Sequence, residues 1–426
     1  MPTIEEILLT DAQQDRLAQI RAAAESAVEK PATHGPDIDL DALGDVAAHD
    51  RVARLASLEK QMREVATDVG MDTSEEGRSG SYFQVDRTPI YEKVAAAFGD
   101  AIEIMSTAEA LARYPEEMLE RWWWRSVAPD KDKYTALVAL KQTEGYFIRV
   151  KAGRKVEKPI QACLFISESD VSQNVHNIIV VEDGAEANVI TGCTIHPKVK
   201  GGLHAGISEF YIGADAKLTF TMIHNWAEEF DVRPRTAIDI GEGGTYINNY
   251  VMLRPVRSIQ AFPVARCRGD RSRAVFNSIV YGLADSHIDL GSETLLEGSG
   301  SRSEAVARTV SRDRSTVYSR GRLIGRTNEC KAHLDCRGIV LSDDSVQWAI
   351  PDLASEGAPG AELSHEAAIS PIAEEEVYYL MSRGVPRDEA VSMITRGFLD
   401  LEIPGLPPAL RRRIDEAIAA TAEEGM

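Results

Sequence analysis

The sequence contains none of the short motifs that mark the commonest enzyme classes. No GxxxxGK[ST] phosphate loop, GxGxxG dinucleotide motif, HExxH zinc motif or GxSxG nucleophile elbow occurs in its 426 residues. These absences exclude the usual P-loop ATPases, dinucleotide-dependent oxidoreductases, zinc proteases and serine hydrolases. If ATP serves the function, a partner must bind it.

Positive charge and cysteine are also scarce. Sixty-seven acidic residues outnumber forty-seven basic ones, and a formal charge of −20 disfavours nucleic acid and anionic membranes as partners. The five cysteines are scattered without a CxxC pair, which argues against a disulfide framework and a local zinc site. They are Cys163, Cys193, Cys267, Cys330 and Cys336.

Long apolar runs are missing as well. No stretch approaches the roughly 20 apolar residues of a membrane span, and the opening MPTIEEILLTDAQQ is acidic where a secretory signal needs a basic region. We therefore expect a cytoplasmic protein with no membrane partner, whose cysteines are free thiols.

The first third of the chain reads as mainly helical. Apolar positions recur every three to four residues over 4–30 and 39–69, which predicts two helices, and an Ala-rich helix is expected over 91–112. A Gly-Ser-rich stretch, EEGRSGSYFQ, separates an N-terminal helical region, 1–78, from a mixed α/β connecting region, 79–145.

Three consecutive tryptophans, Trp122, Trp123 and Trp124, lie in that connecting region. Such a cluster could stack on bases or sugars, but tryptophan more often packs a helix end against a neighbouring domain. We take the packing role as the better interpretation.

From about residue 146 to 363 the composition changes to short runs of Val, Ile, Thr, Tyr and Phe, broken by Gly-Asp-Ser turns. These turns recur at about 28 to 31 residues with one interval near half that, a pattern typical of a solenoid. We interpret it as a β-helix with a coil of about 14 to 15 residues, in which stacking buries each coil's inward row. The remaining segment, 364–426, is predicted to be a helical domain that covers one end.

That final segment carries helix signals of its own. AEEEVYYLMSRG has glutamates in its first turn and Gly384 at its end, and VPRDEAVSMITRGFL repeats this arrangement up to Gly397. A last predicted helix, PALRRRIDEAIAATAEE, has an apolar stripe that needs a partner.

The candidate chemistry lies where the β-rich region gives way to these helices. Cys336 stands in the alternating run HLDCRGIVL, three residues after His333, so a strand would place these two on opposite faces. The triplet Ser364, His365 and Glu366 follows about thirty residues later. Thiolate, imidazole and carboxylate form a mixed ligand set suited to iron or zinc, and a second subunit could complete the coordination.

A structural interpretation stands beside this one. A single cysteine in a strand is often a core residue, and Ser364 could be a helix N-cap with Glu366 in the first turn. Composition and spacing leave both interpretations open.

Longer strings carry a family resemblance. YFQVDR, QNVHNIIVVEDGA, ITGCTIHPKVKGGLHAGISEFYIG, HLDCRGIVL and AELSHEAAISPIAEEEVYYLMSRG, read in order, resemble the SufB/SufD scaffold family of the Suf iron–sulfur assembly system. The resemblance covers roughly residues 80–400 and is closest to compact archaeal SufB-like members. It implies a right-handed parallel β-helix flanked by N-terminal and C-terminal helical regions.

The resemblance also implies the site. Cys336 matches the cluster-assembly cysteine, Glu366 the acidic residue of the His-Glu pair, and His365 a histidine of both SufB-like and SufD-like chains. Cys193, in ITGCT, matches the cysteine that accepts persulfide sulfur, which would pass through the β-helix toward Cys336. A role for Cys163, in PIQACLF, is left open.

The implied function is a non-catalytic scaffold that assembles a transient iron–sulfur cluster and transfers it to apo iron–sulfur proteins. ATP hydrolysis would belong to a SufC-type ABC ATPase docked on the C-terminal helices. In bacterial complexes SufB supplies the Cys and Glu and SufD the His; because this chain has all three, we expect a homodimer, whose twofold axis duplicates every ligand. The sulfur donor, cluster type and flavin binding stay open.

Two other functions fit parts of this sequence. A structural adaptor of an ABC ATPase would bind the ATPase without holding a cluster. A carbohydrate-active β-helix enzyme would need paired carboxylates or a basic residue in an exposed groove, and no acidic pair is evident in successive coils.

Overall fold

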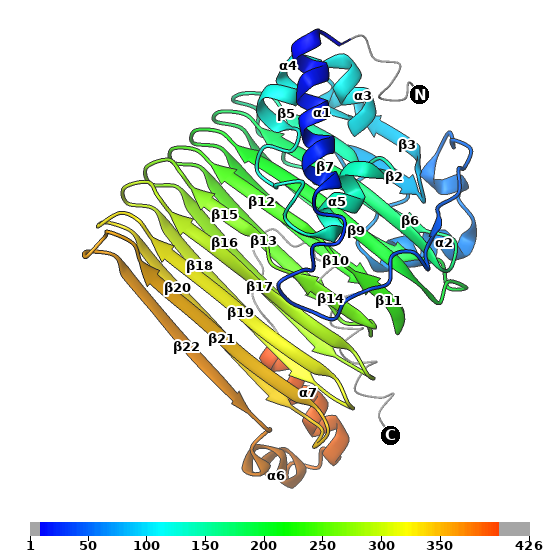
Figure 1. Cartoon of the computed structure of the whole chain (residues 1–426). Coiled ribbons are helices and arrows are strands. Elements are labelled where there is room, and N and C mark those ends of the chain that lie inside the picture. Colours follow the sequence, from blue (N-terminus) through cyan, green and yellow to red (C-terminus); the bar gives the residue numbers. More distant parts are fainter. Residues whose placement is uncertain (1–8, 400–426) are drawn as a thin grey trace.

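A computed structural model describes residues 9–399 of the chain. Its centre is a parallel β-solenoid of about eight turns, with helices toward both chain ends (Figure 1). The prediction of a mainly β, parallel solenoid is therefore confirmed. None of the described helices is long and apolar enough to cross a membrane.

The solenoid is flattened into two sheets, described here for residues 9–399. Sheet A has 12 strands: β1 (Gly44–Asp45), β4 (Ile102–Ser106), β5 (Tyr146–Val150), β7 (Val171–Val181), β9 (Gly201–Ile212), β11 (Glu229–Val232), β12 (Arg235–Ile240), β14 (Ser258–Ala261), β15 (Val264–Cys267), β17 (His287–Leu296), β19 (Thr316–Gly325) and β21 (Val346–Ser355).

Sheet B has 10 strands in the same part of the chain. They are β2 (Gly80–Val85), β3 (Thr88–Val94), β6 (Ile160–Ile166), β8 (Glu186–Ile195), β10 (Lys217–Asn225), β13 (Thr245–Met252), β16 (Arg273–Gly282), β18 (Arg302–Ser311), β20 (Lys331–Val340) and β22 (Glu362–Ser370).

One coil is twice as long as the sequence pattern suggested. Asp231 pairs with Ser258, and Lys331 pairs with Glu362, so register partners in successive coils are 27 to 31 residues apart. The predicted unit of 14 to 15 residues is one strand with its turn. Because successive long strands alternate between the two sheets, each coil needs two such units.

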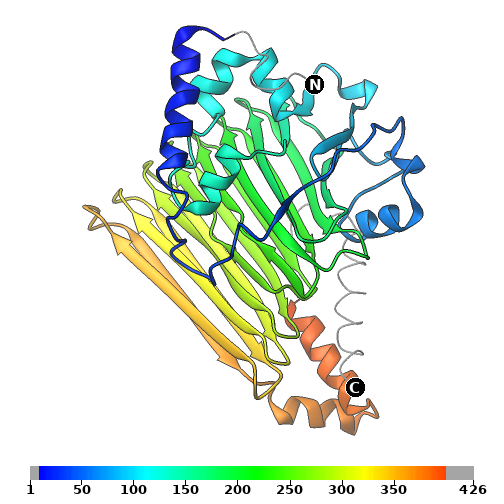
Figure 2. The ribbon, with the colours of Figure 1, turned by 45° about the vertical axis from the view of Figure 1, so that its right-hand side comes forward.

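The helices cover the solenoid unequally. The α-helices are α1 (Asp11–Glu25), α2 (Lys60–Asp68), α3 (Thr107–Arg113), α4 (Pro115–Glu117), α5 (Lys133–Leu140), α6 (Glu374–Ser382) and α7 (Arg387–Leu399). Five of these lie around the early coils, while α6 and α7 lie beside the late ones (Figure 2). The last predicted helix, PALRRRIDEAIAATAEE, lies outside the described residues.

The N-terminal helix predictions were partly wrong. Within 39–69 only α2 is α-helical. Leu55 begins a short 3₁₀ turn and Leu58 directly follows it, and both side chains are buried against β2 and β6. Within 91–112 the chain forms the end of β3, then β4, and only then α3, since β3 pairs antiparallel with β2 and β4 with β5. Strand pairing thus overrides alanine's helix propensity.

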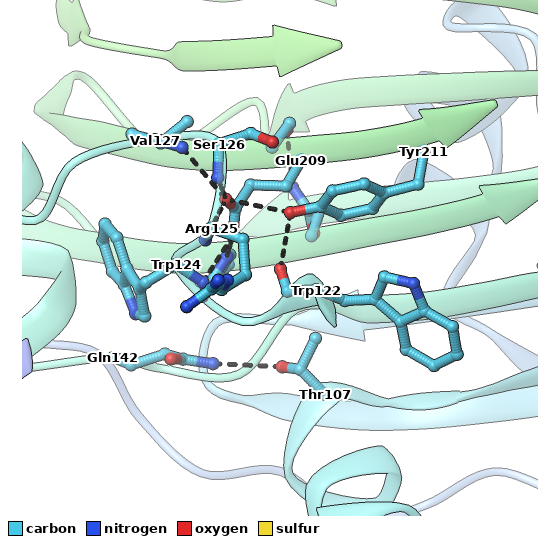
Figure 3. A network of polar contacts seen from close by, with 12 residues as sticks. Thr107, Trp122, Trp124, Arg125, Ser126, Val127, Gln142, Glu209 and Tyr211 are labelled. Carbon is cyan, nitrogen blue, oxygen red and sulfur yellow. Dashed lines mark hydrogen bonds and ion pairs between the residues drawn. The ribbon is translucent and has the colours of Figure 1, made fainter. Parts of the chain in front are cut away.

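The tryptophan cluster packs as expected. Trp122 ends a π-helical turn, η4 (Met118–Trp122), and Trp123 and Trp124 follow it. All three side chains pack on the outer face of sheet A and are at most 7% exposed. The buried carboxylate of Glu209, in β9, accepts four backbone N–H groups from residues 124–127 at 2.5 to 3.0 Å and contacts His176 Nε2 at 2.8 Å (Figure 3). Glu209 is thus the main anchor of the loop on sheet A, and Tyr211 and Asp239 add one hydrogen bond each, to Trp122 O and from Ser126 Oγ.

Candidate functional site at the open end of the solenoid

Cys336 points into the solenoid. In β20 the side chains of Leu334 and Cys336 share the inner face and are 2% and 3% exposed. The hydroxyl of Ser319, on β19 across the interior, donates to Cys336 Sγ at 3.6 Å. Burial raises the pKa of the Cys336 thiol, so without a cation it stays protonated at neutral pH.

The neighbours of Cys336 in β20 face outward. His333 Nδ1 lies 2.9 Å from Ser364 Oγ on the outer surface of sheet B, and Arg337 contacts Asp335 at 3.0 Å. The prediction that His333 and Cys336 occupy opposite faces is confirmed, so these two do not form a pair of ligands.

Ser364, His365 and Glu366 lie within β22, not before a helix. This strand pairs in parallel with β20 through Ser370, and α6 begins only at Glu374, after the N-cap Ala373. The interpretation of Ser364 as an N-cap was therefore wrong, and the helical segment starts later than residue 364. The backbone N–H and C=O groups of β22 pair with β20, so they need no side-chain cap.

The strand register separates the two candidate ligands of β22. His365 is the partner of Leu334 and Glu366 the partner of Asp335, so His365 shares the inner side with Cys336 while Glu366 faces outward. Glu366 Oε1 lies 3.3 Å from Arg337 Nη2. Residues 9–399 contain no group of three His, Cys, Asp or Glu side chains placed to hold a metal, so one chain does not assemble the predicted ligand set.

We call the last coil, β21 with β22, the open end. In the described residues β22 pairs only with β20 and β21 only with β19, which leaves one edge of each strand without a partner. Three large apolar side chains are exposed here: Val346 (42%), Trp348 (53%) and Ile369 (40%). Cys336 is thus one coil below an uncovered surface.

Cys193 lies in the same interior, near the other end. It is on the inner face of β8, fully buried, and its Sγ lies 3.6 Å from Sδ of Met222. Its register partner on β10 is His224, whose Nδ1 lies 2.9 Å from the Tyr250 hydroxyl. Five strand spacings separate β8 from β20 in sheet B, or about 24 Å.

An internal cavity of about 60 Å³ lies between these positions. We call it the interior chamber; its lining includes Tyr250, Ser278, Ala307, Ser319, Leu334 and Cys336. Tyr250, Ser278, Ala307 and Cys336 are successive register partners of one inner row. The sequence analysis did not predict the chamber. Its signal in the sequence is the recurrence of small residues, Ser278, Ala307 and Cys336, at one register position of successive coils.

Cys163 is on the other face of its strand. It lies on the outer face of sheet B beside its register partner Phe83 of β2, in a cluster with Leu55, whereas Leu164 is the register partner of Cys193 inside the solenoid. Cys163 therefore does not line the interior with Cys193 and Cys336.

Comparisons with known proteins agree with this architecture. The family described as "SUF system FeS cluster assembly, SufBD core domain" matches residues 164–398. An iron–sulfur cluster assembly SufBD family protein of Methanothermobacter thermautotrophicus is 48% identical over 91% of this chain and 94% of its own length. One of Archaeoglobus fulgidus is 44% identical over 84% and 94%.

A bacterial relative is more distant. The iron–sulfur cluster assembly protein SufB of Bacillus subtilis is 26% identical over 71% of this chain and 65% of its own length. The match to the core domain covers more than half of the chain, and the archaeal relatives match nearly all of it. The chain belongs to the SufBD family of iron–sulfur cluster assembly proteins.

Proposed function

We propose that this protein is a scaffold on which iron and sulfide assemble at Cys336 before the cluster passes to apo iron–sulfur proteins. The observation that carries the proposal is the position of this thiol. Cys336 lies between the interior chamber and the open end, so it can meet sulfur from one side and metal from the other. Binding of a metal cation would stabilise the thiolate, which burial alone disfavours.

A second copy of the chain would complete the ligand set. The edges of β21 and β22 that have no partner within residues 9–399, together with exposed Trp348 and Ile369, are a surface suited to strand pairing with another subunit. A twofold axis there would present two Cys336, two His365 and two Glu366 to one another. Imidazole and carboxylate ligands would leave the cluster more easily released than four thiolates would.

Glu366 would have to exchange partners to serve as a ligand. Its ion pair with Arg337 is exposed on both sides, 59% and 44%, and such pairs contribute less than about 1 kcal/mol. The strand orientation favours His365 over Glu366 as the ligand nearer to Cys336. A carboxylate from the partner copy remains available to the same site.

Sulfur would enter at Cys193 and reach Cys336 through the interior. Between them, the inner rows carry Met222, Tyr250 and Ser278, and the interior chamber occupies the last part of the path. Because about 24 Å separates the two strands, direct exchange between the two thiols is too distant. If Cys193 carried a persulfide, two external thiols would have to cleave its S–S bond and be oxidised to a disulfide, so that the sulfur leaves as hydrosulfide and can travel toward Cys336.

A SufC-type ATPase would dock on α6 and α7. Four of their large apolar side chains are exposed, which is unusual for helices that have no partner. They are Tyr378 (59%), Tyr379 (60%), Met381 (39%) and Met393 (40%). The chain has no P-loop of its own. Leu399 of α7 packs near Val310 and Ile339 on the outer face of sheet B, so a displacement of α7 by the ATPase would be transmitted to the late coils.

The same exposed helices also favour the second candidate, an ATPase adaptor that holds no cluster. Iron and sulfide contents separate the two functions. The full chain is co-expressed with its ATPase, purified anaerobically, and compared with Cys336→Ala and the matched control Cys330→Ala, another buried cysteine. The readouts are iron and sulfide per chain and Mössbauer spectra.

Three outcomes are informative. Loss of iron and sulfide in Cys336→Ala with retention in Cys330→Ala supports the scaffold. A stable cluster in Cys336→Ala contradicts the assignment of that thiol. Absence of iron from all three proteins, with the ATPase still bound, favours the adaptor.

A further inference from the structure

A cleft of about 350 Å³ lies between the α6–α7 hairpin and sheet B. The two helices pack on each other beside the late coils (Figure 2), and Leu399 of α7 contacts the outer face of sheet B. The cleft is the space that this packing leaves open. Its volume falls within the range of small-molecule sites, about 300 to 1,000 Å³.

The walls of the cleft are mainly apolar. Tyr281 of β16 and Leu341, which follows β20, line it on the side of the solenoid. Val377 of α6 and Val391 of α7 line it on the side of the helices, and Ile372 lies between β22 and α6. An apolar molecule in the cleft would therefore contact both the solenoid and the hairpin.

The charged side chains of the cleft balance one another. Arg387 at the start of α7 donates to both carboxylate oxygens of Glu374 at the start of α6, at 2.6 and 2.9 Å. Arg312 and Asp388 are the other charged residues of the described lining. Because a charge that leaves water needs an opposite partner, a cleft without net charge favours an uncharged ligand.

One buried polar group of the cleft has no partner. Thr395, in α7, lines the cleft and is 2% exposed, and its Oγ1 has no hydrogen-bond partner among residues 9–399. A helical threonine commonly bonds the carbonyl oxygen three or four residues earlier. Because buried hydroxyls are almost always hydrogen-bonded in native proteins, Thr395 indicates a polar ligand group inside the cleft.

We propose that this cleft binds a small uncharged molecule with an apolar body and one carbonyl or hydroxyl oxygen. The body lies on the apolar walls, and the Thr395 hydroxyl forms a hydrogen bond with the oxygen. The cleft lies beneath the helices that we propose as the ATPase docking surface. The inference stands without that role, because it concerns binding by the chain alone.

A fluorescent probe of this class tests the proposal. Prodan is an uncharged naphthalene with one propionyl carbonyl, and its emission shifts to the blue in an apolar site. It is titrated into the purified full-length chain. Val391→Trp and Ser392→Trp fill the cleft at two positions, and Thr395→Val removes the hydroxyl with little change of shape. Met393→Trp is the matched control, because Met393 of the same helix is exposed and lies outside the described lining.

We expect the unchanged protein to bind a single Prodan molecule per chain with blue-shifted emission. Each filling variant should lower the affinity by more than about tenfold, because the indole and the probe cannot occupy the same space. Thr395→Val should lower it about fivefold, as the loss of one hydrogen bond to a neutral group does. Met393→Trp should bind as the unchanged protein does.

Far-UV circular dichroism and urea denaturation show which variants fold, and the second filling variant serves if the first does not. Saturable binding that the folded filling variants do not weaken, or that Met393→Trp weakens equally, would place the probe elsewhere and overturn the site. Absence of saturable binding by the unchanged protein would also overturn it and leave water as the partner of Thr395. Equal affinity in Thr395→Val would overturn the role of the hydroxyl.

Discussion

The two ends of the solenoid are built from the same repeated coil but are finished in opposite ways. Around the early coils, helices and the tryptophan loop cover sheet A, and buried polar groups such as Glu209 have many partners. At the open end, the strand edges of β21 and β22 lack partners within residues 9–399 and large apolar groups are exposed. Within residues 9–399, one end of the solenoid is covered by packed elements and the other exposes strand edges and apolar side chains.

The covered end should therefore be the one that mutation unfolds. Glu209→Ala removes the acceptor of four backbone N–H groups and the contact of His176, and all of these hydrogen bonds are buried except the partly buried one from Arg125 N. We expect a loss of about 3 to 5 kcal/mol in the free energy of unfolding, as for a buried polar network that loses one partner. Urea denaturation measures it. Glu356→Ala, which removes only a half-exposed ion pair with Arg326, is the control.

Acid should also act on the interior of the covered half. Burial lowers the pKa of His204 and of His224 to about 3. As the pH falls below about 6.5, the unfolded chain binds protons that the folded chain does not, so stability falls by about 1.4 kcal/mol per pH unit for each histidine until about pH 3.

Urea denaturation at pH 7 and pH 5 checks this, with His204→Gln expected to reduce the dependence on pH. His333→Gln, at the outer surface of sheet B, is the control. A slope that His204→Gln leaves unchanged would show that the interior histidines are not responsible.

Substitutions at the open end should change the association of the chain with a second copy, and not its free energy of unfolding. Trp348 is stacked only on Tyr318, with ring centroids 6.4 Å apart, and is 53% exposed. Trp348→Asp should change the free energy of unfolding by less than about 0.5 kcal/mol, as surface substitutions do, while abolishing the proposed homodimer. Light scattering across a concentration series measures this, and Val28→Asp, an exposed apolar residue at the other end, is the control.

The smallest effect is expected for Arg337→Ala. The exposed ion pair with Glu366 should contribute less than about 0.5 kcal/mol to folding. If Glu366 becomes a ligand, freeing it should leave iron content equal or higher. Lower iron content with unchanged stability would indicate instead that Arg337 positions Glu366.

The sequence predicted the repeat and the solenoid well, because every coil restates the same alternation and turn. It predicted the coil length poorly, since nothing in a turn sequence says whether the next strand joins the same sheet or the opposite one. Segments 39–69 and 91–112 were predicted as helices because alanine and periodic apolar residues dominate locally, whereas pairing partners are distant in sequence.

The sequence supplied the candidate site residues but not their geometry. The resemblance singled out Cys336, His365 and Glu366, and alternation placed His333 opposite Cys336. The direction of β22 depends on its register with β20, which fixes His365 inward and Glu366 outward. That register pairs residues about thirty positions apart. It depends on the conformation of the whole intervening coil, which local sequence patterns do not determine.

Because the coils stack at a constant spacing, their number sets the distance between the two interior thiols, Cys193 and Cys336. Each coil of 27 to 31 residues adds one strand spacing, about 4.8 Å, to the separation of Cys193 and Cys336 along the solenoid. Gain or loss of a whole coil would change that separation in fixed steps while keeping every side chain on its face. The turns already absorb differences of a few residues between coils. Gain or loss of a single strand with its turn would instead move every later strand to the opposite sheet.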